Sequence, residues 1–108
     1  MTGSLSSSPN RLEIAECGSN ALSVSGEIDA HSAPVLAERF ATLSSDAGDV
    51  VVDLSGVTFM DSSGLRELIE LQQRVGTPPN GLVLQSPSQT VLHLLEVAGL
   101  DGHFTVAH

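Results

Sequence analysis

The sequence predicts an α/β domain built around a mixed central sheet, and three observations lead to this class. Strand-like and helix-like segments follow in the order β-β-α-β-α-β-α-β, an alternation typical of a largely parallel sheet. Only a short turn separates the first two strand-like segments, which predicts an antiparallel hairpin at one edge. The length of 108 residues fits one domain with a core of its own.

The N-terminal part predicts a tail followed by the hairpin. Residues 1–10 are rich in serine and are expected to form a flexible tail before a single domain at residues 11–108. Polar and apolar residues alternate in Arg11–Glu16 and in Ala21–Gly26, with Cys17–Asn20 between them. Alternation of this kind indicates two half-exposed strands joined by a turn.

The first helix is expected to begin after Ser32, a candidate N-cap, with Pro34 in its first turn. It should end before the polar segment Ser44–Gly48. Its predicted apolar face consists of Val35, Leu36, Phe40 and Leu43.

The apolar run Val50–Leu54 predicts a strand buried on both faces. A second helix follows, and Glu70 and Arg74 in it form a candidate i, i+4 ion pair. The turn-forming segment Gly76–Gly81 should end this helix. Its predicted apolar stripe is Leu65, Leu68, Ile69 and Val75.

The C-terminal part predicts a short strand at Leu82–Leu84 and a third helix opened by Ser86–Ser88. Gly99 followed by apolar Leu100 is typical of a Schellman stop, and Phe104–Val106 could add a last edge strand. The residues of the third helix expected to face inward are Val91, Leu92, Leu95 and Ala98.

Composition excludes several functions. Aromatic residues make up 3% of the chain, without Trp or Tyr, so the stacking platforms of single-stranded nucleic-acid binders are missing. The formal charge is −9, all four bases are arginines, and there is no lysine for a Walker loop or a Schiff base. So acidic a domain disfavours nucleic acid and anionic membranes and fits a partner with a basic face.

Cysteine and histidine usage predicts no metal, cofactor or disulfide. The single cysteine, Cys17, cannot form an internal disulfide, which fits a reducing cytoplasm. Neither a ~20-residue apolar span nor a signal peptide is visible. The four histidines and Cys17 lack the spacing of metal ligands, and glycine-rich phosphate loops are absent. A serine hydrolase is not expected, because the Gly-x-Ser-x-Gly elbow is missing and only His31 could face Ser62.

The polar cluster Asp61-Ser62-Ser63-Gly64 stands where the second helix should begin. The first N–H groups of a helix lack intrahelical partners and carry partial positive charge, so a phosphate on a serine there would be stabilised. The glycine would let another backbone approach. Two readings follow from the residues alone: Asp61, Ser62 and Ser63 only cap the helix, or one serine is a phosphoacceptor.

Asp29 lies in the other loop between a strand and a helix. If both loops share one edge of the sheet, Asp29 and Asp61 would flank Ser62. Their carboxylates could accept a hydrogen bond from its hydroxyl, and they would repel a phosphate once it formed. The alternative is that Asp29 only stabilises its own loop.

The segment Val51–Leu65 closely resembles the signature of the bacterial anti-sigma factor antagonists, which are stand-alone STAS domains. Gly26–Ala33 resembles the second conserved region of that family, and Val97–Leu100 with Phe104 resembles its C-terminal stretch. The resemblance implies a STAS-like fold with helices packed mainly on one face of the sheet.

By this resemblance the protein would be a cytoplasmic partner-switching regulator without catalytic activity, monomeric when free. Its unphosphorylated form would bind an anti-sigma factor that is a GHKL-type ATPase and serine kinase, and so release a sigma factor. The kinase would phosphorylate Ser62, the serine directly after the motif aspartate Asp61, and a PP2C-type phosphatase would reverse this. The surroundings of the phosphosite and the binding surface would be formed by Asp29, Asp61, Ser63 and Gly64.

Two details stay open at this stage. Ser63 competes with Ser62, and could instead be the structural cap while Ser62 takes the phosphate. The domain could also be a STAS regulatory module of a transporter, a lipid-trafficking complex or a signalling assembly, although the Asp-Ser-Ser-Gly sequence favours the antagonist.

Overall fold

A computed structural model describes residues 12–108 of the protein, so the tail expected at residues 1–10 lies outside the described part. The five strands form one sheet in the order β1-β2-β3-β4-β5. β1 runs antiparallel to β2, and the three other neighbouring pairs are parallel. The predicted mixed sheet with an antiparallel edge is therefore confirmed. The strands are β1 (Glu13–Gly18), β2 (Ala21–Ile28), β3 (Val50–Met60), β4 (Leu82–Gln85) and β5 (Thr105–Ala107).

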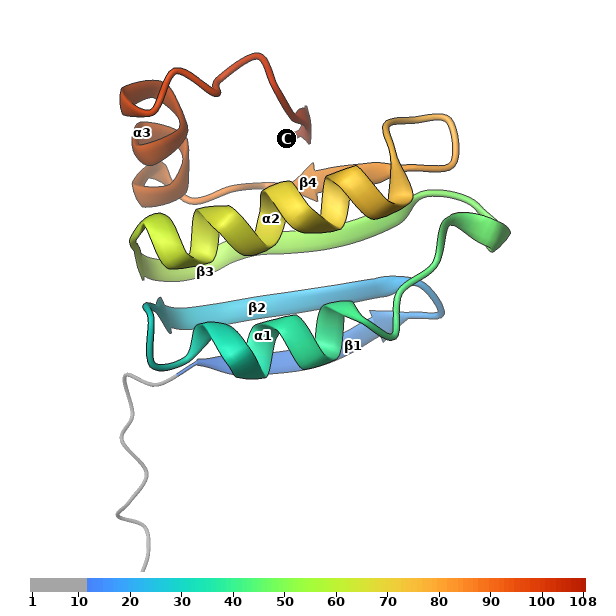
Figure 1. Ribbon diagram of the computed structural model, residues 1–108, viewed down its shortest axis with the longest axis horizontal. Coiled ribbons are helices and arrows are strands. Elements are labelled where there is room, and N and C mark those ends of the chain that lie inside the picture. Colours follow the sequence, from blue (N-terminus) through green and yellow to red (C-terminus); the bar gives the residue numbers. More distant parts are fainter. Residues whose placement is uncertain (1–11) are drawn as a thin grey trace, which may run out of the picture.

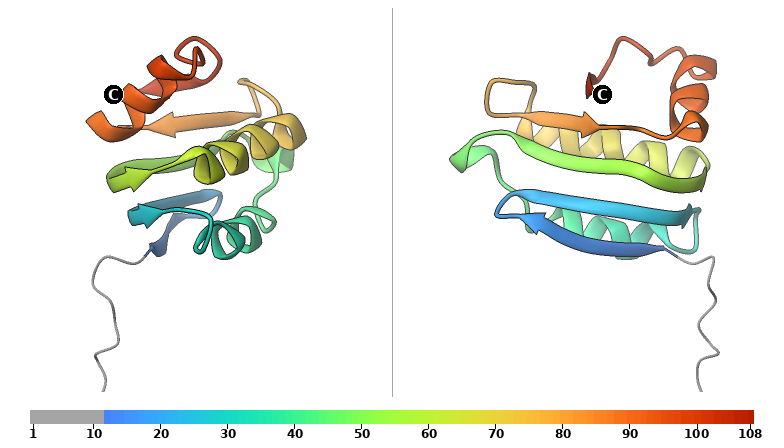
Figure 2. Two further views of the ribbon diagram at one scale, coloured as in Figure 1. Left: turned by 60° about the vertical axis from the view of Figure 1, so that its left-hand side comes forward. Right: turned by 180° about the vertical axis from the view of Figure 1, so that it is seen from behind.

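Two of the helices lie side by side across one face of the sheet (Figure 1). These are α1 and α2. In the view from behind in Figure 2, the strands lie in front and both helices lie on the far side of the sheet. A short 3-10 helix, η2, follows α1. The helices are α1 (Ala33–Phe40), η2 (Ser45–Ala47), α2 (Ser62–Val75) and α3 (Gln89–Val97).

β3 is longer than predicted and differently buried. It continues past Leu54 to Met60, because parallel pairing with β2 resumes after each of two irregularities, between Ser23 and Ser25 and between Gly26 and Glu27. Only alternate residues of its first half are fully buried, whereas Val51 and Asp53 are partly exposed. The expectation of burial on both faces is wrong, because α1 and α2 cover the same face.

α3 takes the place of a missing strand neighbour. β4 has only four residues and pairs with β3 over Val50–Asp53. Beyond that point the Ser88 N–H, at the start of α3, donates to the Leu54 carbonyl at 3.2 Å. Val91 and Leu95 of α3 are buried in the common core. An otherwise open strand edge is thus covered by a helix.

Two side chains of the predicted helical faces behave differently. Val35 does not extend the apolar face of α1 but is 53% exposed. The predicted Glu70–Arg74 ion pair is also absent from the described residues. Arg74 instead donates to the carbonyls of Phe40 and Leu43 at 2.6 and 2.8 Å, and so ties the end of α1 to α2.

The C-terminal segment closes α3 as predicted. Gly99 has φ +74°, and the N–H groups of Gly99 and Leu100 donate to the carbonyls of Glu96 and Leu95. This is the bond pattern of a Schellman motif. Ala98, expected to face inward, is exposed. The Gln72 amide, buried in α2, donates to the His103 carbonyl at 2.9 Å and anchors the chain before β5.

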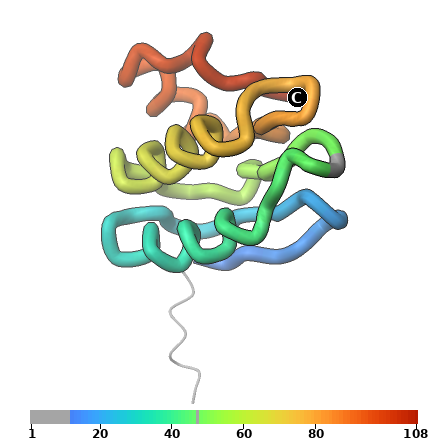
Figure 3. Tube along the Cα trace, turned by 45° about the vertical axis from the view of Figure 1, so that its right-hand side comes forward, coloured from blue at the N-terminus to red at the C-terminus, as the bar shows by residue number. Residues whose placement is uncertain are grey.

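The connections after α1 and after α2 meet at one end of the molecule, opposite the start of α2 (Figure 3). The Gly81 N–H donates to the Asp49 carboxylate at 3.0 Å, and the Val50 N–H donates to the Gly81 carbonyl at 2.8 Å. At this end the two connections are hydrogen-bonded to each other. The polar cluster Asp61-Ser62-Ser63-Gly64 lies at the other end.

Candidate functional site

The ends of β2 and β3 bring Asp29 and Asp61 to one edge of the sheet. Ile28 and Met60 are register partners in these parallel strands, and each aspartate is the next residue of its chain segment. The Asp61 N–H donates to the Ile28 carbonyl at 3.2 Å, which joins the two loops directly. The condition stated from the sequence, that these two loops share one edge of the sheet, is therefore met.

Asp61 is the N-cap of α2. Its Oδ1 accepts the Ser63 N–H at 2.8 Å, and its carbonyl accepts the N–H groups of Gly64 and Leu65. Ser63 is therefore not the cap, because an aspartate side chain already holds that position. Ser62 is the first helical residue, and its side chain is exposed.

The occupied N–H groups change the expected surroundings of a phosphate. Two of the donors that open α2, those of Ser63 and Gly64, are already bonded to Asp61. Among residues 12–108, the Ser62 N–H is the donor of the first turn without such a bond. A phosphate on Ser62 would therefore find little of the backbone cradle that the position in sequence suggests.

Gly64 brings α2 against the ends of both strands. A Cβ atom at this position would lie 2.5 Å from Cγ2 of Ile28 and 2.8 Å from Cγ of Met60. The glycine is needed for close packing against these side chains rather than for an approaching backbone. It sets the height of Ser62 and Ser63 above the sheet.

Asp29 is bound within its own loop. Its Oδ1 accepts the N–H groups of His31 and Ser32 at 3.0 and 2.9 Å and lies 3.2 Å from the Ser32 hydroxyl. The pKa of the Asp29 carboxyl is lowered, mainly by the hydrogen bond from the Ser32 N–H. Desolvation acts in the opposite direction but does not outweigh the hydrogen bonds. Asp29 is thus an ionised, fixed charge at the edge that carries Ser62.

Neither carboxylate accepts a bond from the Ser62 hydroxyl in the described residues, since each binds backbone N–H groups instead. Ser32 stands at the N-cap position of α1, but its side chain does not cap that helix. Its hydroxyl oxygen accepts the Asp29 N–H at 3.0 Å. The loop is therefore held rigid by reciprocal contacts between Asp29 and Ser32.

A surface depression of about 450 Å³ lies between the starts of α1 and α2. Arg66 and Glu67 border it, and neither was among the site residues predicted from the sequence. The only signal in the sequence is that Arg66 follows Ser62 by four positions. The lining residues are Ala30, Ala33, Pro34, Ser62, Ser63, Arg66 and Glu67.

The depression is bordered by side chains of opposite charge, Arg66 and Glu67. Burial raises the pKa of the Glu67 carboxyl, the negative charge of Glu70 adds to the rise, and Arg66 counteracts it. His31 is exposed and contributes its backbone N–H to Asp29. The described residues hold no cluster of three His, Cys, Asp or Glu side chains suited to a metal ion. None of their helices is long and apolar enough to cross a bilayer.

A family model described as "Mlab, STAS domain" matches residues 15–106. Together with the five-stranded mixed sheet and the helix that starts at the polar cluster, this match defines the class. The chain belongs to the STAS-domain family.

Within this family the chain is similar to anti-sigma-B factor antagonists. It is 33% identical to that of Bacillus subtilis over 79 residues, which cover 73% of this chain and 72% of the relative. It is 35% identical to that of Listeria monocytogenes, over 72% and 69% of the two chains.

Two solved structures share the fold. An anti-sigma factor antagonist from Mycobacterium paratuberculosis superposes with a TM-score of 0.78 and 28% identity, over 94% of this chain and 89% of that one. The unphosphorylated form of the anti-sigma factor antagonist SpoIIAA superposes with a TM-score of 0.60 over 91% and 89% of the chains. Its identity of 19% carries the fold alone.

Proposed function

We propose that this protein is an anti-sigma factor antagonist whose unphosphorylated form binds an anti-sigma factor and so releases a sigma factor. The similarity to named antagonists supports the class of partner. The observation that carries the mechanism is the exposed Ser62 side chain at the first position of α2, on the edge that also holds Asp29 and Asp61.

The switch is an added charge rather than a refolding of the domain. A phosphate on Ser62 would add about −1.5 to −2 charges at pH 7. That charge would stand near the ionised Asp29 and the N-cap Asp61 on a protein that is already at −9. Like charges brought together at an interface cost several kcal/mol, enough to release a partner docked over this edge.

The docking surface is expected to include the start of α2 and the adjoining depression. Ser62 and Ser63 are small and leave room for a partner to approach closely, whereas the buried Gly64 holds the start of α2 against Ile28 and Met60. Asp29 and Asp61 act through rigidity and charge, because both are fixed by backbone donors. Binding, rather than catalysis by this chain, accounts for all of these features.

The partner that modifies Ser62 is a serine kinase of the GHKL ATPase type, which is also the anti-sigma factor. A PP2C-type phosphatase restores the binding form. The exposure of Ser62 suits both reactions, since each enzyme must reach the hydroxyl or its phosphate. Ser63 is half-buried and is the poorer acceptor.

The experiment is phosphorylation by a candidate anti-sigma factor ATPase from the same genome, followed by localisation of the phosphate by mass spectrometry. We expect one phosphate on Ser62, its loss in Ser62→Ala and its retention in Ser63→Ala. If Ser62→Ala still gained a phosphate and Ser63→Ala did not, the phosphorylated residue would be Ser63 instead.

Binding to the same ATPase tests the switch itself. Ser62→Ala should bind like the unphosphorylated parent, and Ser62→Asp should bind at least about tenfold more weakly, which corresponds to ~1.4 kcal/mol. Ser63→Asp is the matched control for a charge one residue away. Equal affinities of Ser62→Asp and the parent would contradict the charge mechanism.

A further inference from the structure

Arg66 is the cation placed to meet a phosphate on Ser62. The chain has four arginines and no lysine. Of the three in the described residues, Arg39 and Arg74 lie in the last turns of their helices. Arg66 is in the second turn of α2 and borders the same depression as Ser62.

The geometry of the helix directs the Arg66 side chain toward Ser62. Residues four positions apart lie on one face of a helix, and Cα–Cβ bonds tilt toward the N-terminus. The side chain of Arg66 therefore extends back over the turn that contains Ser62. Arg66 is exposed, and it makes no ion pair within the described residues.

Apart from His31, in the loop of Asp29, the other ionisable side chains near Ser62 are acidic. Asp29 and Asp61 hold the same edge of the sheet, and Glu67 borders the depression. Two bonded N–H groups at the helix start leave little backbone donation for a phosphate. A phosphate there would have Arg66 as its permanently charged cation, and it would be repelled by several carboxylates.

We propose that Arg66 is the positioning residue for phosphorylated Ser62, and that its guanidinium binds the phosphate one helical turn away. This inference rests on the proposed phosphorylation of Ser62. The pair would hold the phosphate over the start of α2 and keep it doubly ionised at neutral pH. The phosphorylated form would then present its charge in one fixed place on the docking edge.

The test is a pH titration of the phosphate by ³¹P NMR in protein that carries phosphoserine at position 62, introduced during translation. Removal of the guanidinium in Arg66→Gln should raise the second pKa of the phosphate by about 0.15–0.4 unit, as for an exposed i, i+4 ion pair. In about 1 M salt the difference should largely disappear.

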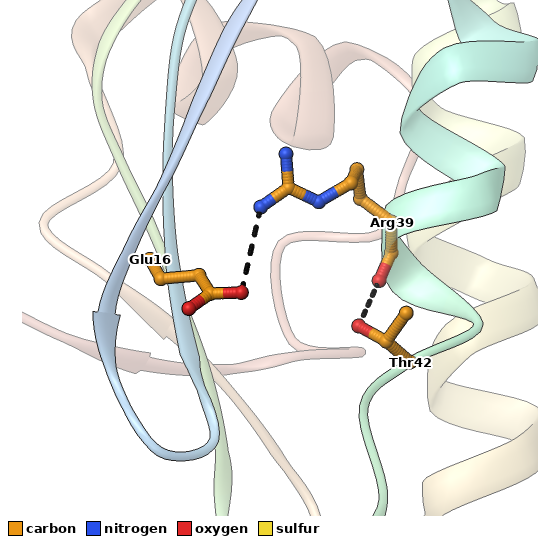
Figure 4. A network of polar contacts seen from close by, with 3 residues as sticks. All are labelled: Glu16, Arg39 and Thr42. Atoms are coloured by element: carbon orange, nitrogen blue, oxygen red, sulfur yellow. Dashed lines mark hydrogen bonds and ion pairs between the residues drawn. The ribbon is translucent and has the colours of Figure 1, made fainter.

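Arg39→Gln is the matched control, because it removes the same charge from a distant place. The Arg39 guanidinium (Nη2) lies 3.9 Å from Oε2 of Glu16, at the end of α1 far from Ser62 (Figure 4). Removing the Arg39 charge should leave the phosphate pKa unchanged. Glu67→Gln should shift the pKa in the opposite direction to Arg66→Gln, since it removes a repelling carboxylate.

An unchanged pKa in Arg66→Gln would overturn the proposal, as would an equal shift in Arg39→Gln. This experiment needs no kinase, because the phosphate is already in place. If a cognate ATPase failed to modify Ser62, the proposed function would fail while the titration still reported on the Arg66 pair. The two ideas can therefore fail separately.

Discussion

Gly64 is the position where one methyl group tests how α2 packs on the sheet. In Gly64→Ala the new Cβ would lie 2.5 Å from Cγ2 of Ile28 and 2.8 Å from Cγ of Met60. Both neighbours are core side chains, with Ile28 fully buried and Met60 4% exposed. Neither can move aside into solvent, so α2 or the strand ends must shift.

The expected magnitude is a balance of two effects. Overpacking a core costs about 1–3 kcal/mol, whereas replacing glycine by alanine within a helix gains up to about 1 kcal/mol. We therefore expect Gly64→Ala to lower the free energy of unfolding by about 1–2 kcal/mol. The substitution should also weaken binding of the anti-sigma factor, because Ser62 and Ser63 move with the start of α2.

Urea unfolding followed by far-UV circular dichroism is the suitable assay, since the chain has no Trp or Tyr for fluorescence. Gly102→Ala is the matched control: its Cβ would meet nothing within 4 Å, and its stability should stay close to that of the parent. In an Ile28→Ala background the penalty of Gly64→Ala should shrink, because the clashing Cγ2 is gone. Parental stability of Gly64→Ala would refute the packing argument.

Other substitutions test what stabilises the folded domain. Arg74→Ala should lower the free energy of unfolding by about 1–3 kcal/mol, because the carbonyls of Phe40 and Leu43 lose a charged donor; an unchanged urea midpoint would contradict this. The lowered pKa of Asp29 means that its bonds stabilise the fold above the unfolded pKa and are lost as pH falls through the folded value. Asp29→Asn should therefore flatten the acid limb of stability against pH, and an unaltered limb would count against it. Glu67 has a raised pKa, so its ionisation opposes folding as pH rises. Glu67→Gln should stabilise the protein at pH 7 but not below about pH 4, as measured by thermal unfolding at both pH values.

Most of the element order could be predicted because its signals are local. The alternation in residues 13–16 and 21–26, the turn chemistry of residues 76–81 and the Gly99-Leu100 stop all depend on near neighbours in the chain. Errors appeared where a distant partner decided the outcome. β3 was predicted too short because its apolar run stops at Leu54, whereas pairing with β2 carries the strand to Met60.

The site shows the same division. The polar cluster at a helix start could be found from the sequence, and so could the capping role of this segment, although the cap was not assigned to Asp61 alone. The partners of Arg74 could not be predicted from the sequence. Helical i, i+4 spacing points to Glu70, whereas the carbonyls that Arg74 binds lie more than 30 positions away, at the end of α1. The depression beside Ser62 was also missed, since it exists only where α1 and α2 lie together.

By itself the sequence determined the order of strands and helices, and that Asp61-Ser62-Ser63-Gly64 stands at the start of α2. Periodicity, capping and turn preferences act over a few residues and can be read along the chain. Only the tertiary structure decided that Asp29 and Asp61 share one edge, and that Ser62, Arg66 and Glu67 border one depression. Strand register and helix packing arise from contacts between residues far apart in the chain, so they emerge only when the sheet is assembled.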